Sequence, residues 1–416
     1  MAHENASGSI LKQPLAVWAI AFACVVSFMG IGLVDPILPA IADSLKATPT
    51  QTEMLFTTYL LITGVMMFFT SWLSSRIGAK TTLLIGLALV VVFAALAGSS
   101  GTVGQIIGFR AGWGLGNALF ISTALATIVG AASGGAANAI ILYEAALGVG
   151  LAIGPLVGGL LGSASWRGPF FGTAVLMAIG FIAIVTMLRT PKSATKPAPT
   201  PFSAPFRGLG RPALAIMAAT ALFYNMGFFV LLAWTPFALQ EVGVSNALQL
   251  GYIFFGWGVA VAITSVFVAP RLTARMRRTT VLVIVIPLLA VVELLAAILH
   301  SHLVALVVLV VIGGLFLGIL NTVLTECSME ATDLPRPVAS SAYSGVRFVG
   351  GAIAPPLASY LAGKFGTSAA PFWYGVIVLV VATLIIVVGR SKLGRADGAE
   401  EDREEVGEAV AVGDAD

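Results

Sequence analysis

Five ionisable side chains interrupt long apolar runs of this sequence. They are Asp35, Arg110, Glu144, Glu293 and Arg347. A charged side chain at the centre of an apolar layer costs at least about 2.5–3.5 kcal/mol, so such a residue usually faces a cavity or a partner. A carboxyl group in a cavity can bind and release a proton, and a nearby arginine changes its proton affinity. Proton transfer is therefore the first chemistry that these residues suggest.

The composition of the chain places these residues in a lipid bilayer. Of 416 residues, 58% are hydrophobic and only 10% are charged, and the mean hydropathy is +1.00. A water-soluble domain cannot bury that much apolar surface. Since about 20 apolar residues cross the hydrocarbon core as a helix, the pattern predicts an all-α integral membrane protein with twelve transmembrane helices. Their expected ranges are 15–41, 54–74, 81–98, 103–126, 138–162, 168–188, 212–239, 248–270, 279–299, 303–326, 337–362 and 370–389.

Basic residues are unevenly distributed among the loops between these spans. One set of loops and flanks carries Lys12, Arg76, Lys80, Arg189, Lys192, Lys196, Arg207, Arg211, Arg271, Arg275, Arg277, Arg278, Arg336, Arg390, Lys392 and Arg395. The opposite loops carry only Lys46, Arg167 and Lys364. Because basic loops stay in the cytoplasm, the pattern predicts a multi-pass protein of the cell (cytoplasmic) membrane with both termini cytoplasmic.

A segment rich in proline, serine, alanine and basic residues, 190–211, interrupts the apolar pattern. It predicts a cytoplasmic linker between an N-terminal six-helix bundle, 15–189, and a C-terminal six-helix bundle, 212–389. Residues 1–14 form the expected cytoplasmic N-terminus. Residues 390–416 are rich in aspartate and glutamate, and we expect them to form a disordered cytoplasmic tail.

The two halves repeat short sequence elements at a shift of about 200 residues. Lys80–Leu84 reads like Arg278–Leu282, and Gly154-Pro155 reads like Ala354-Pro355. Six helices per half is an even number, so both halves enter the membrane with the same orientation. Parallel repeats of this kind place a substrate site between the halves near the midplane, and rocking of the halves gives alternating access. The sequence therefore predicts two pseudo-symmetric six-helix bundles.

Glycines cluster in the expected span 138–162. Gly150, Gly154, Gly158 and Gly159 surround Pro155. Their spacing puts small residues on one helix face, where another backbone can approach closely, and the proline bends the helix. We expect this face to let the two halves pack tightly against leakage.

These motifs resemble the major facilitator superfamily and, within it, the twelve-span drug:proton antiporters. Gly150–Gly159 fits the antiporter signature G-x-x-x-G-P-x-x-G-G, and Arg110–Gly116 is similar to the element R-x-x-x-G-x-G. Asp35–Pro39 is similar to the P-x-x-P close of the first helix. The resemblance covers roughly residues 14–390 and implies the major facilitator fold.

The loop Ser71–Lys80 resembles the superfamily signature G-x-L-A-D-R-x-G-R-K. Arg76, Gly78 and Lys80 fit it, whereas Ser75 stands where the family has aspartate. In the family that aspartate latches the halves on the cytoplasmic side by facing the start of span eleven. A serine there can still accept a hydrogen bond from a helix N-terminus, but it lacks the charge–dipole contribution of about 0.3–1 kcal/mol. We therefore expect a looser cytoplasmic latch.

The resemblance also implies roles for the ionisable residues. Asp35 and Arg110 would line the central cavity and couple proton binding to substrate release; alternatively, Asp35 only caps the kinked backbone at Pro36. Glu144 is either a second proton carrier or a hydrogen-bonding contact to a neighbouring helix. Arg347 is expected to pair structurally, with substrate contact as the alternative. Glu293 is expected at the lipid edge, because its span is peripheral in this fold.

Polar and aromatic residues of the expected cavity helices complete the predicted substrate cavity. They are Trp113, Asn117, Tyr224, Asn225, Trp234 and Asn321, together with Arg347. Pockets that accept many compounds combine apolar walls with few fixed polar groups. Ordinary packing is the alternative for each of these side chains.

The sequence lacks the motifs of several enzyme classes. It has no G-x-x-x-x-G-K-[ST] element, and its three histidines and two cysteines show no metal-ligand spacing. We expect no enzyme activity, cofactor, metal site or nucleic-acid partner. The predicted function is proton-coupled export of small amphipathic organic compounds by a monomer, with the bilayer, a small-molecule substrate and protons as partners. A nutrient importer and a non-transporting membrane receptor or scaffold are the alternatives.

Overall fold

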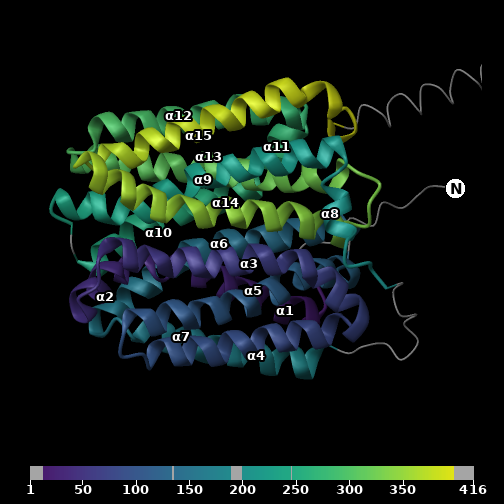
Figure 1. Ribbon diagram of the computed structural model, residues 1–416. Coiled ribbons are helices and arrows are strands. Elements are labelled where there is room, and N and C mark those ends of the chain that lie inside the picture. Colours follow the sequence, from purple (N-terminus) through teal and green to yellow (C-terminus); the bar gives the residue numbers. More distant parts are fainter. Residues whose placement is uncertain (1–12, 134, 189–198, 245, 398–416) are drawn as a thin grey trace, which may run out of the picture.

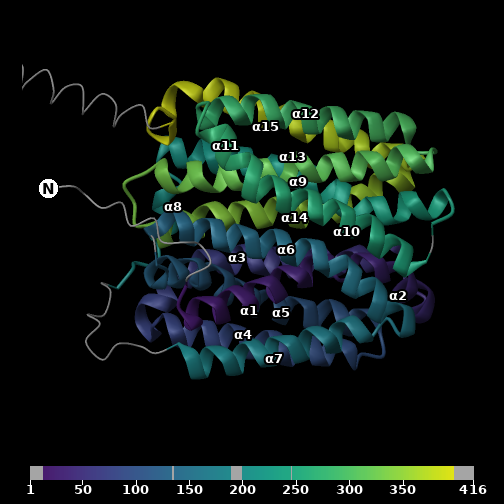
Figure 2. The same ribbon diagram turned by 180° about the vertical axis from the view of Figure 1, so that it is seen from behind.

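The computed structural model describes residues 13–133, 135–188, 199–244 and 246–397, and all regular structure in these ranges is helical. Figure 1 shows long helices running side by side in two groups. Helices α1–α7, at the purple and blue end of the colour bar, form one bundle, and α9–α15, coloured teal to yellow, form the other. The view from behind in Figure 2 shows the same division.

The N-terminal bundle begins with a broken helix. Its elements are α1 (Leu15–Gly32), the 3-10 turn η1 (Asp35–Ile37), α2 (Leu38–Leu45), α3 (Pro49–Ile77), α4 (Ala79–Gly98), α5 (Val103–Ala131), α6 (Gly135–Ala164) and α7 (Gly168–Met187). The expected first span is interrupted at η1, because Pro36 and Pro39 lack the N–H groups that would continue the helical hydrogen bonds.

The C-terminal bundle repeats this arrangement after a short linker helix, α8 (Ala204–Gly208). Its elements are α9 (Pro212–Glu241), α10 (Ala247–Ile263), the π-helical segment η2 (Thr264–Val268), α11 (Ala269–Thr273), α12 (Arg278–Leu299), α13 (Leu303–Glu330), α14 (Arg336–Phe365), α15 (Ala369–Gly389) and the 3-10 turns η3 (Arg390–Lys392) and η4 (Arg395–Asp397).

Eleven helical stretches of the described chain are long and apolar enough to cross a membrane. The expected span 337–362 is missing from this set because α14 carries serines and Arg347, which lower its hydropathy. It is nevertheless 30 residues long and packs between α3 of one bundle and α9 of the other. The predicted all-helical membrane fold with twelve helices in two bundles is confirmed.

The internal repeat is visible in how helices pack within each bundle. A Cβ atom at Gly150 of α6 would lie 2.5 Å from the carbonyl oxygen of Val25 on α1. A Cβ atom at Gly350 of α14 would lie 2.3 Å from the carbonyl oxygen of Leu222 on α9. Glycines 200 positions apart thus let equivalent helix pairs touch backbone to backbone.

The two ends of the molecule differ in charge. We call one end the basic end; it holds Arg76, Lys80, Arg207, Arg211, Arg271, Arg275, Arg277, Arg278, Arg390 and Lys392. The first and last described residues both lie there (Figure 1). The other end, which we call the opposite end, holds Lys46, Arg167 and Lys364.

Candidate functional site

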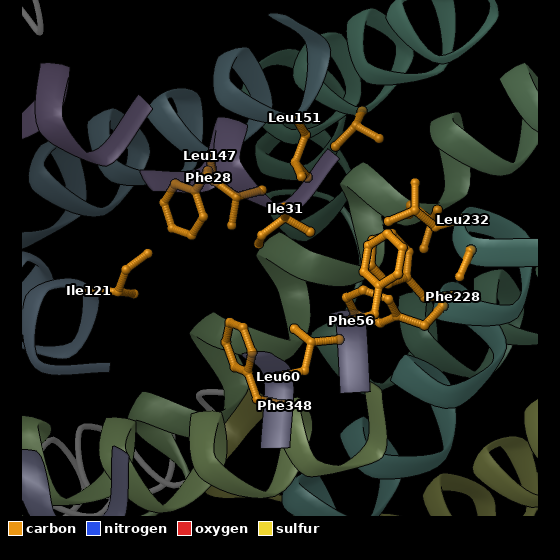
Figure 3. Close-up of a cluster of buried hydrophobic side chains, with 14 of the residues drawn as sticks. Phe28, Ile31, Phe56, Leu60, Ile121, Leu147, Leu151, Phe228, Leu232 and Phe348 are labelled. Carbon is orange, nitrogen blue, oxygen red and sulfur yellow. The ribbon is translucent and has the colours of Figure 1, made fainter. Parts of the chain in front are cut away.

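A cavity lies between the two bundles. Helices α1, α5 and α6 line it from one side, and α9, α13 and α14 line it from the other. About 730 Å³ of space here, open solvent included, is not occupied by protein atoms. Its wall is mainly apolar and aromatic; Figure 3 shows Phe28, Ile121 and Leu147 of the first bundle and Phe228 and Phe348 of the second arranged around this space.

Four residues predicted for the substrate cavity form one polar cluster. The side-chain oxygen of Asn321 accepts hydrogen bonds from the Tyr224 hydroxyl at 2.9 Å and from Nη2 of Arg347 at 3.0 Å. The Asn225 amide donates to the Arg347 carbonyl at 2.7 Å. These bonds join α9, α13 and α14 and fix the guanidinium group where Arg347 lines the cavity.

Glu144 faces the same cavity from the other bundle. It lies on α6, only 2% of its surface is exposed, and one carboxyl oxygen has no hydrogen-bond partner among the described residues. Glu144, Arg347 and Thr325 all line the cavity, yet no ion pair joins Glu144 to Arg347 in the described ranges. An acid on one bundle and a base on the other can therefore respond to a molecule or to water placed between them.

Arg110 lies outside the lining of this cavity. It is fully buried, donates to the carbonyl oxygens of Leu55 and Gly30 at 3.3 Å each, and stacks over the rings of Tyr59 and Trp113 at 4.3 and 4.7 Å. It thereby holds α5 to α3 and α1.

Asp35 begins η1, and its side chain lies outside the described residues. The η1 turn contacts α6 of its own bundle and α9 and α10 of the other. The region of Asp35 is therefore one where the two bundles meet.

Three other residues predicted for the cavity pack elsewhere. Trp113 is fully buried against Tyr59 and Phe170. Asn117 accepts a hydrogen bond from Ser27. The indole N–H of Trp234 donates to the Ser368 carbonyl at 3.2 Å. None of Trp113, Asn117 and Trp234 lines the central cavity.

Sequence reasoning missed several polar residues of the cavity wall. They are Ser122, Tyr143, Thr325, Ser340 and Ser344. Hydroxyl groups are common in membrane helices, where they bond to their own backbone, so their residue type gave no signal. Among these residues, only Ser344 had a signal in the sequence, because the internal repeat places it at the position equivalent to Glu144.

The glycine run of α6 serves two neighbours rather than one. A Cβ atom at Gly154 would lie 2.7 Å from the carbonyl oxygen of Met29 on α1, and one at Gly158 would lie 2.3 Å from that of Leu33, which caps α1. Gly150 approaches Val25 of α1 in the same way. Gly148 and Gly159 instead approach Ala262 and Ala247 at the two ends of α10, each within 2.7 Å of where a Cβ would lie. The expectation of one face that joins the two halves is therefore corrected, because only the second set joins them.

Pro155 belongs to the face that joins the halves. Its carbonyl oxygen lies 2.8 Å from where a Cβ at Gly251 of α10 would sit. The helix continues through Pro155.

The signature segment Ser71–Lys80 is mostly helical, since α3 ends at Ile77 and α4 begins at Ala79, and its part on α3 contacts the linker. The Ser75 hydroxyl donates to the Trp72 carbonyl at 2.8 Å and accepts from the backbone N–H of Thr200 at 3.1 Å. The expected acceptor role of Ser75 toward the start of span eleven is thus replaced by a bond to the linker.

Three other residues of the loop have local roles. Lys80 donates to the carbonyl oxygens of Leu188 and Val185 at the end of α7, at 2.5 and 3.2 Å. Gly78 adopts a φ of +88°, a conformation that favours glycine. The Arg76 guanidinium lies 5.1 Å from the centre of the Trp72 ring.

The linker adds two aromatic side chains to this basic end. Phe202 stacks on Phe69 at 4.7 Å between ring centres and meets the edge of Trp72. Phe206 stacks on Phe68 at 5.0 Å. Helix α8 also packs against α14, so the linker spans the α3–α14 contact. We call Phe202, Phe206 and their partners on α3 the aromatic strap.

Glu293 does not lie at the lipid edge. It is fully buried, and its carboxyl carbon lies 2.8 Å from where a Cβ at Gly375 of α15 would sit. Because Gly375 lacks a side chain, the carboxyl group fits between α12 and α15. The expectation of a peripheral, snorkelling residue is therefore wrong.

The start of the expected tail is packed against the C-terminal bundle. Asp397 accepts from the backbone N–H of Thr279 at 2.9 Å and from its hydroxyl at 2.6 Å, at the first turn of α12. Arg278 pairs with Glu326 and Glu330 and donates to the Ala396 carbonyl. Residues 390–397 thus belong to the folded part of the chain, while 398–416 and the linker residues 190–198 lie outside the described residues, as do residues 1–12.

Comparison with known proteins gives three consistent findings. The sequence model of the Major Facilitator Superfamily matches residues 20–276 and 245–412. The multidrug efflux protein YfmO of Bacillus subtilis (strain 168) is 51% identical over 392 residues, which cover 94% of this chain and 96% of that protein. A crystal structure of a bacterial homolog to the human lysosomal transporter Spinster, inward-facing and unoccupied, superposes with a TM-score of 0.67 at 15% identity, covering 92% of this chain and 96% of that one. The last likeness concerns the fold alone.

Proposed function

Because this chain belongs to the Major Facilitator Superfamily, we propose that it is a secondary active exporter of small amphipathic organic compounds, driven by protons. The observation that carries the proposal is the cavity between the bundles, with its apolar wall, Glu144 on one side and Arg347 on the other. The name of the relative that is 51% identical supports the same activity.

The cavity wall accounts for the class of compound. Aromatic and aliphatic side chains accept apolar groups of varied shape, whereas a few fixed polar groups orient a charged or polar end. Glu144 would attract a cationic group, and a proton on Glu144 would remove that attraction. Compound and proton therefore compete for one site, which is what exchange of one for the other requires.

Orientation follows from the charges of the two ends. We assign the basic end to the cytoplasm, with both termini there, because basic loops are retained on that side. The cavity lies within a single chain, so a monomer contains the whole proposed site. Rocking of the two bundles would expose it to each side in turn.

Asp35 and Arg110 have a proposed role at the opposite end. The η1 turn packs against both bundles, so opening that end would bring outside water to Asp35. We assign proton uptake from outside to Asp35, tuned by Arg110, and later proton binding to Glu144 in the cavity. Asp35→Asn should then abolish proton-driven transport while expression is kept; full transport by this variant would contradict the role of Asp35.

Transport in membrane vesicles tests the function as a whole. Inverted vesicles with an acidic interior should accumulate cationic dyes, and Glu144→Gln should lose the dependence on the pH gradient. The matched control is Glu241→Gln, an exposed acid at the end of α9, which should transport like the unmodified protein. Uptake only into right-side-out vesicles would indicate an importer, and no transport in either orientation would favour a receptor or scaffold.

A further inference from the structure

Glu53 is a buried acid that neither the sequence analysis nor the proposed mechanism uses. It lies in the second turn of α3, at the opposite end, and is fully buried. Neither carboxyl oxygen has a hydrogen-bond partner among the described residues. Such a group needs an explanation, because buried polar atoms are nearly always paired.

Glu53 lies on the face of α3 that meets the other bundle. Thr50, three residues earlier and therefore on the same face, lies 3.1 Å from the Ser359 hydroxyl of α14. Gly64, three turns further along, touches the backbone of Gly345 and Val349 on α14. Ser359 of α14 therefore lies beside the face of α3 that carries Glu53. The carboxyl group is thus held at the α3–α14 contact.

No ion pair involves Glu53 within the described residues. Arg110 of α5 donates to the carbonyl oxygens of Leu55 and Gly30. Asp43 of α2 and Lys364 of α14 are exposed, and the charged residue of α4, Lys80, lies at the basic end. Glu241 of α9 and His300 line a pocket with Thr50 and Ser359, and neither forms an ion pair with Glu53 in the described ranges. An ionised carboxylate without a partner in such surroundings is strongly disfavoured. The closed contact is therefore compatible with a protonated Glu53.

Burial of Glu53 depends on the bundles being closed at this end. Helices α3 and α14 belong to different bundles, so separation of their ends would admit outside water to the carboxyl group. In water a glutamate ionises at neutral pH. The two states of the contact consequently differ in how tightly they hold one proton.

We propose that Glu53 is a proton-binding site that controls closure of this end. It takes one proton from the outside water before α3 and α14 close, and it returns that proton to the same side when they separate. No proton crosses the membrane through Glu53, so it sets the gate without driving transport. The inference rests on alternating access in the proposed function, but not on the proton being the coupled ion.

Distances between the bundles as a function of pH test this site. Spin labels at Ser44→Cys on α2 and Phe365→Cys on α14 report the opposite end, since both positions are exposed, whereas the native Cys24 and Cys327 are buried. Each proton held more tightly by the closed state changes the open-to-closed ratio by up to about tenfold per pH unit. Because the closed state holds the proton, opening should increase as the pH rises.

In Glu53→Gln the opposite end should be closed more often. The dependence of the open-to-closed ratio on pH should decrease by the contribution of one proton. Asp43→Asn changes an exposed acid of α2 at the same end that does not line the pocket beside Thr50 and Ser359, and it should leave the slope unchanged. A slope in Glu53→Gln equal to that of the unmodified protein would overturn the proposal. Proton-driven dye transport by Glu53→Gln should persist at a reduced rate. If the unmodified protein transports no dye at all, the proposed function is refuted, but the pH dependence of the distances still tests the role of Glu53.

A second measurement keeps the proposal testable if Glu53→Gln does not fold. An apolar carbodiimide reacts with protonated carboxyl groups in apolar surroundings, and mass spectrometry of peptides locates the product. The unmodified protein should react at Glu53, increasingly so at acidic pH. Reaction at Glu144 with none at Glu53 over the whole pH range would also overturn the proposal.

Discussion

The two bundles meet along two helix pairs, α6–α10 and α3–α14, which the internal repeat relates to each other. The α6–α10 pair is joined by small residues along its length: Gly148 meets Ala262, Gly258 meets Ala152, and Gly159 meets Ala247. The α3–α14 pair has a glycine contact only in its middle. One of its ends holds the polar group of Thr50, Glu53 and Ser359, and the other holds the aromatic strap.

This difference indicates how the two pairs contribute to movement. Backbones in van der Waals contact over several turns resist separation but allow a small rotation, because packed small residues have no side chains to interlock. Polar or aromatic contacts at the ends of a pair can be replaced by contacts with water when the helices separate there. We infer that α6–α10 acts as the pivot, and that α3–α14 opens at one end or the other.

The largest effect is expected from enlarging Gly258 at the pivot. A Cβ atom there would lie 2.1 Å from Cα and 2.5 Å from the backbone nitrogen of Ala152, and backbone atoms cannot turn aside. Gly258→Val should destabilise the protein by about 3 kcal/mol or more, the upper range for overpacking, and abolish transport. Thermal unfolding of the detergent-solubilised protein measures the loss.

Gly256 provides the matched control for the pivot. It lies on the same helix, and a Cβ atom there would make an ordinary contact of 3.6 Å with the Val311 side chain. Gly256→Val should lower the unfolding temperature much less than Gly258→Val. Equal losses in the two variants would show that any added volume on α10 is harmful, and the assignment of a pivot would fail.

A smaller effect is expected in the middle of α3–α14. A Cβ atom at Gly64 would lie 2.9 Å from the carbonyl oxygen of Gly345 and from the backbone nitrogen of Val349. Gly64→Ala should cost about 1–3 kcal/mol and separate the pair slightly at both ends. The spin-label distance at the opposite end should increase; an unchanged distance would contradict the idea that this pair is the one that opens.

The fold was largely predictable from sequence, whereas the contacts that control it were not. Span positions follow from apolar length, which is written directly in the chain. Glu53 lies one residue before the expected span 54–74, so apolar length alone assigns it to a loop. Helical spacing placed Gly150 and Gly159 on small-residue faces, but it could not say that one meets α1 and the other α10, since the neighbour of a face is set by tertiary packing.

The polar cluster of the cavity shows that sequence identifies unusual polar residues more readily than their partners. Tyr224, Asn321 and Arg347 were predicted for the cavity because polar groups are rare in apolar spans, and the structure brings them together. Arg110 and Trp113 satisfied the same criterion, yet they pack against each other away from the cavity. Sequence identifies residues that need a partner, but it does not tell whether that partner is protein or a ligand.

A moderate effect is expected from removing the aromatic strap. Aromatic pairs contribute about 0.5–1.5 kcal/mol each beyond their buried area, so replacing Phe202 and Phe206 together with alanine should favour opening of the basic end several-fold. A cysteine at Ser340, which lines the cavity, should react faster with a water-soluble maleimide added from the cytoplasmic side. An unchanged rate would mean that the linker only lies on the surface.

The smallest effect is expected at Ser75, where the strap and the signature loop meet. Its hydroxyl accepts from the Thr200 N–H at 3.1 Å, and a carboxylate in the same place would accept a charge-assisted bond from that group, which is roughly twice as strong as a neutral one. Ser75→Asp should therefore tighten the linker against α3, favour the closed basic end by about 0.5–1 kcal/mol, and slow the maleimide reaction at Ser340→Cys. The control is Ser75→Asn, because asparagine has the shape of aspartate and supplies an acceptor without charge. It should have a smaller effect. If Ser75→Asp slows the reaction even when Phe202 and Phe206 are alanine, the carboxylate acts on α14 directly and not through the strap.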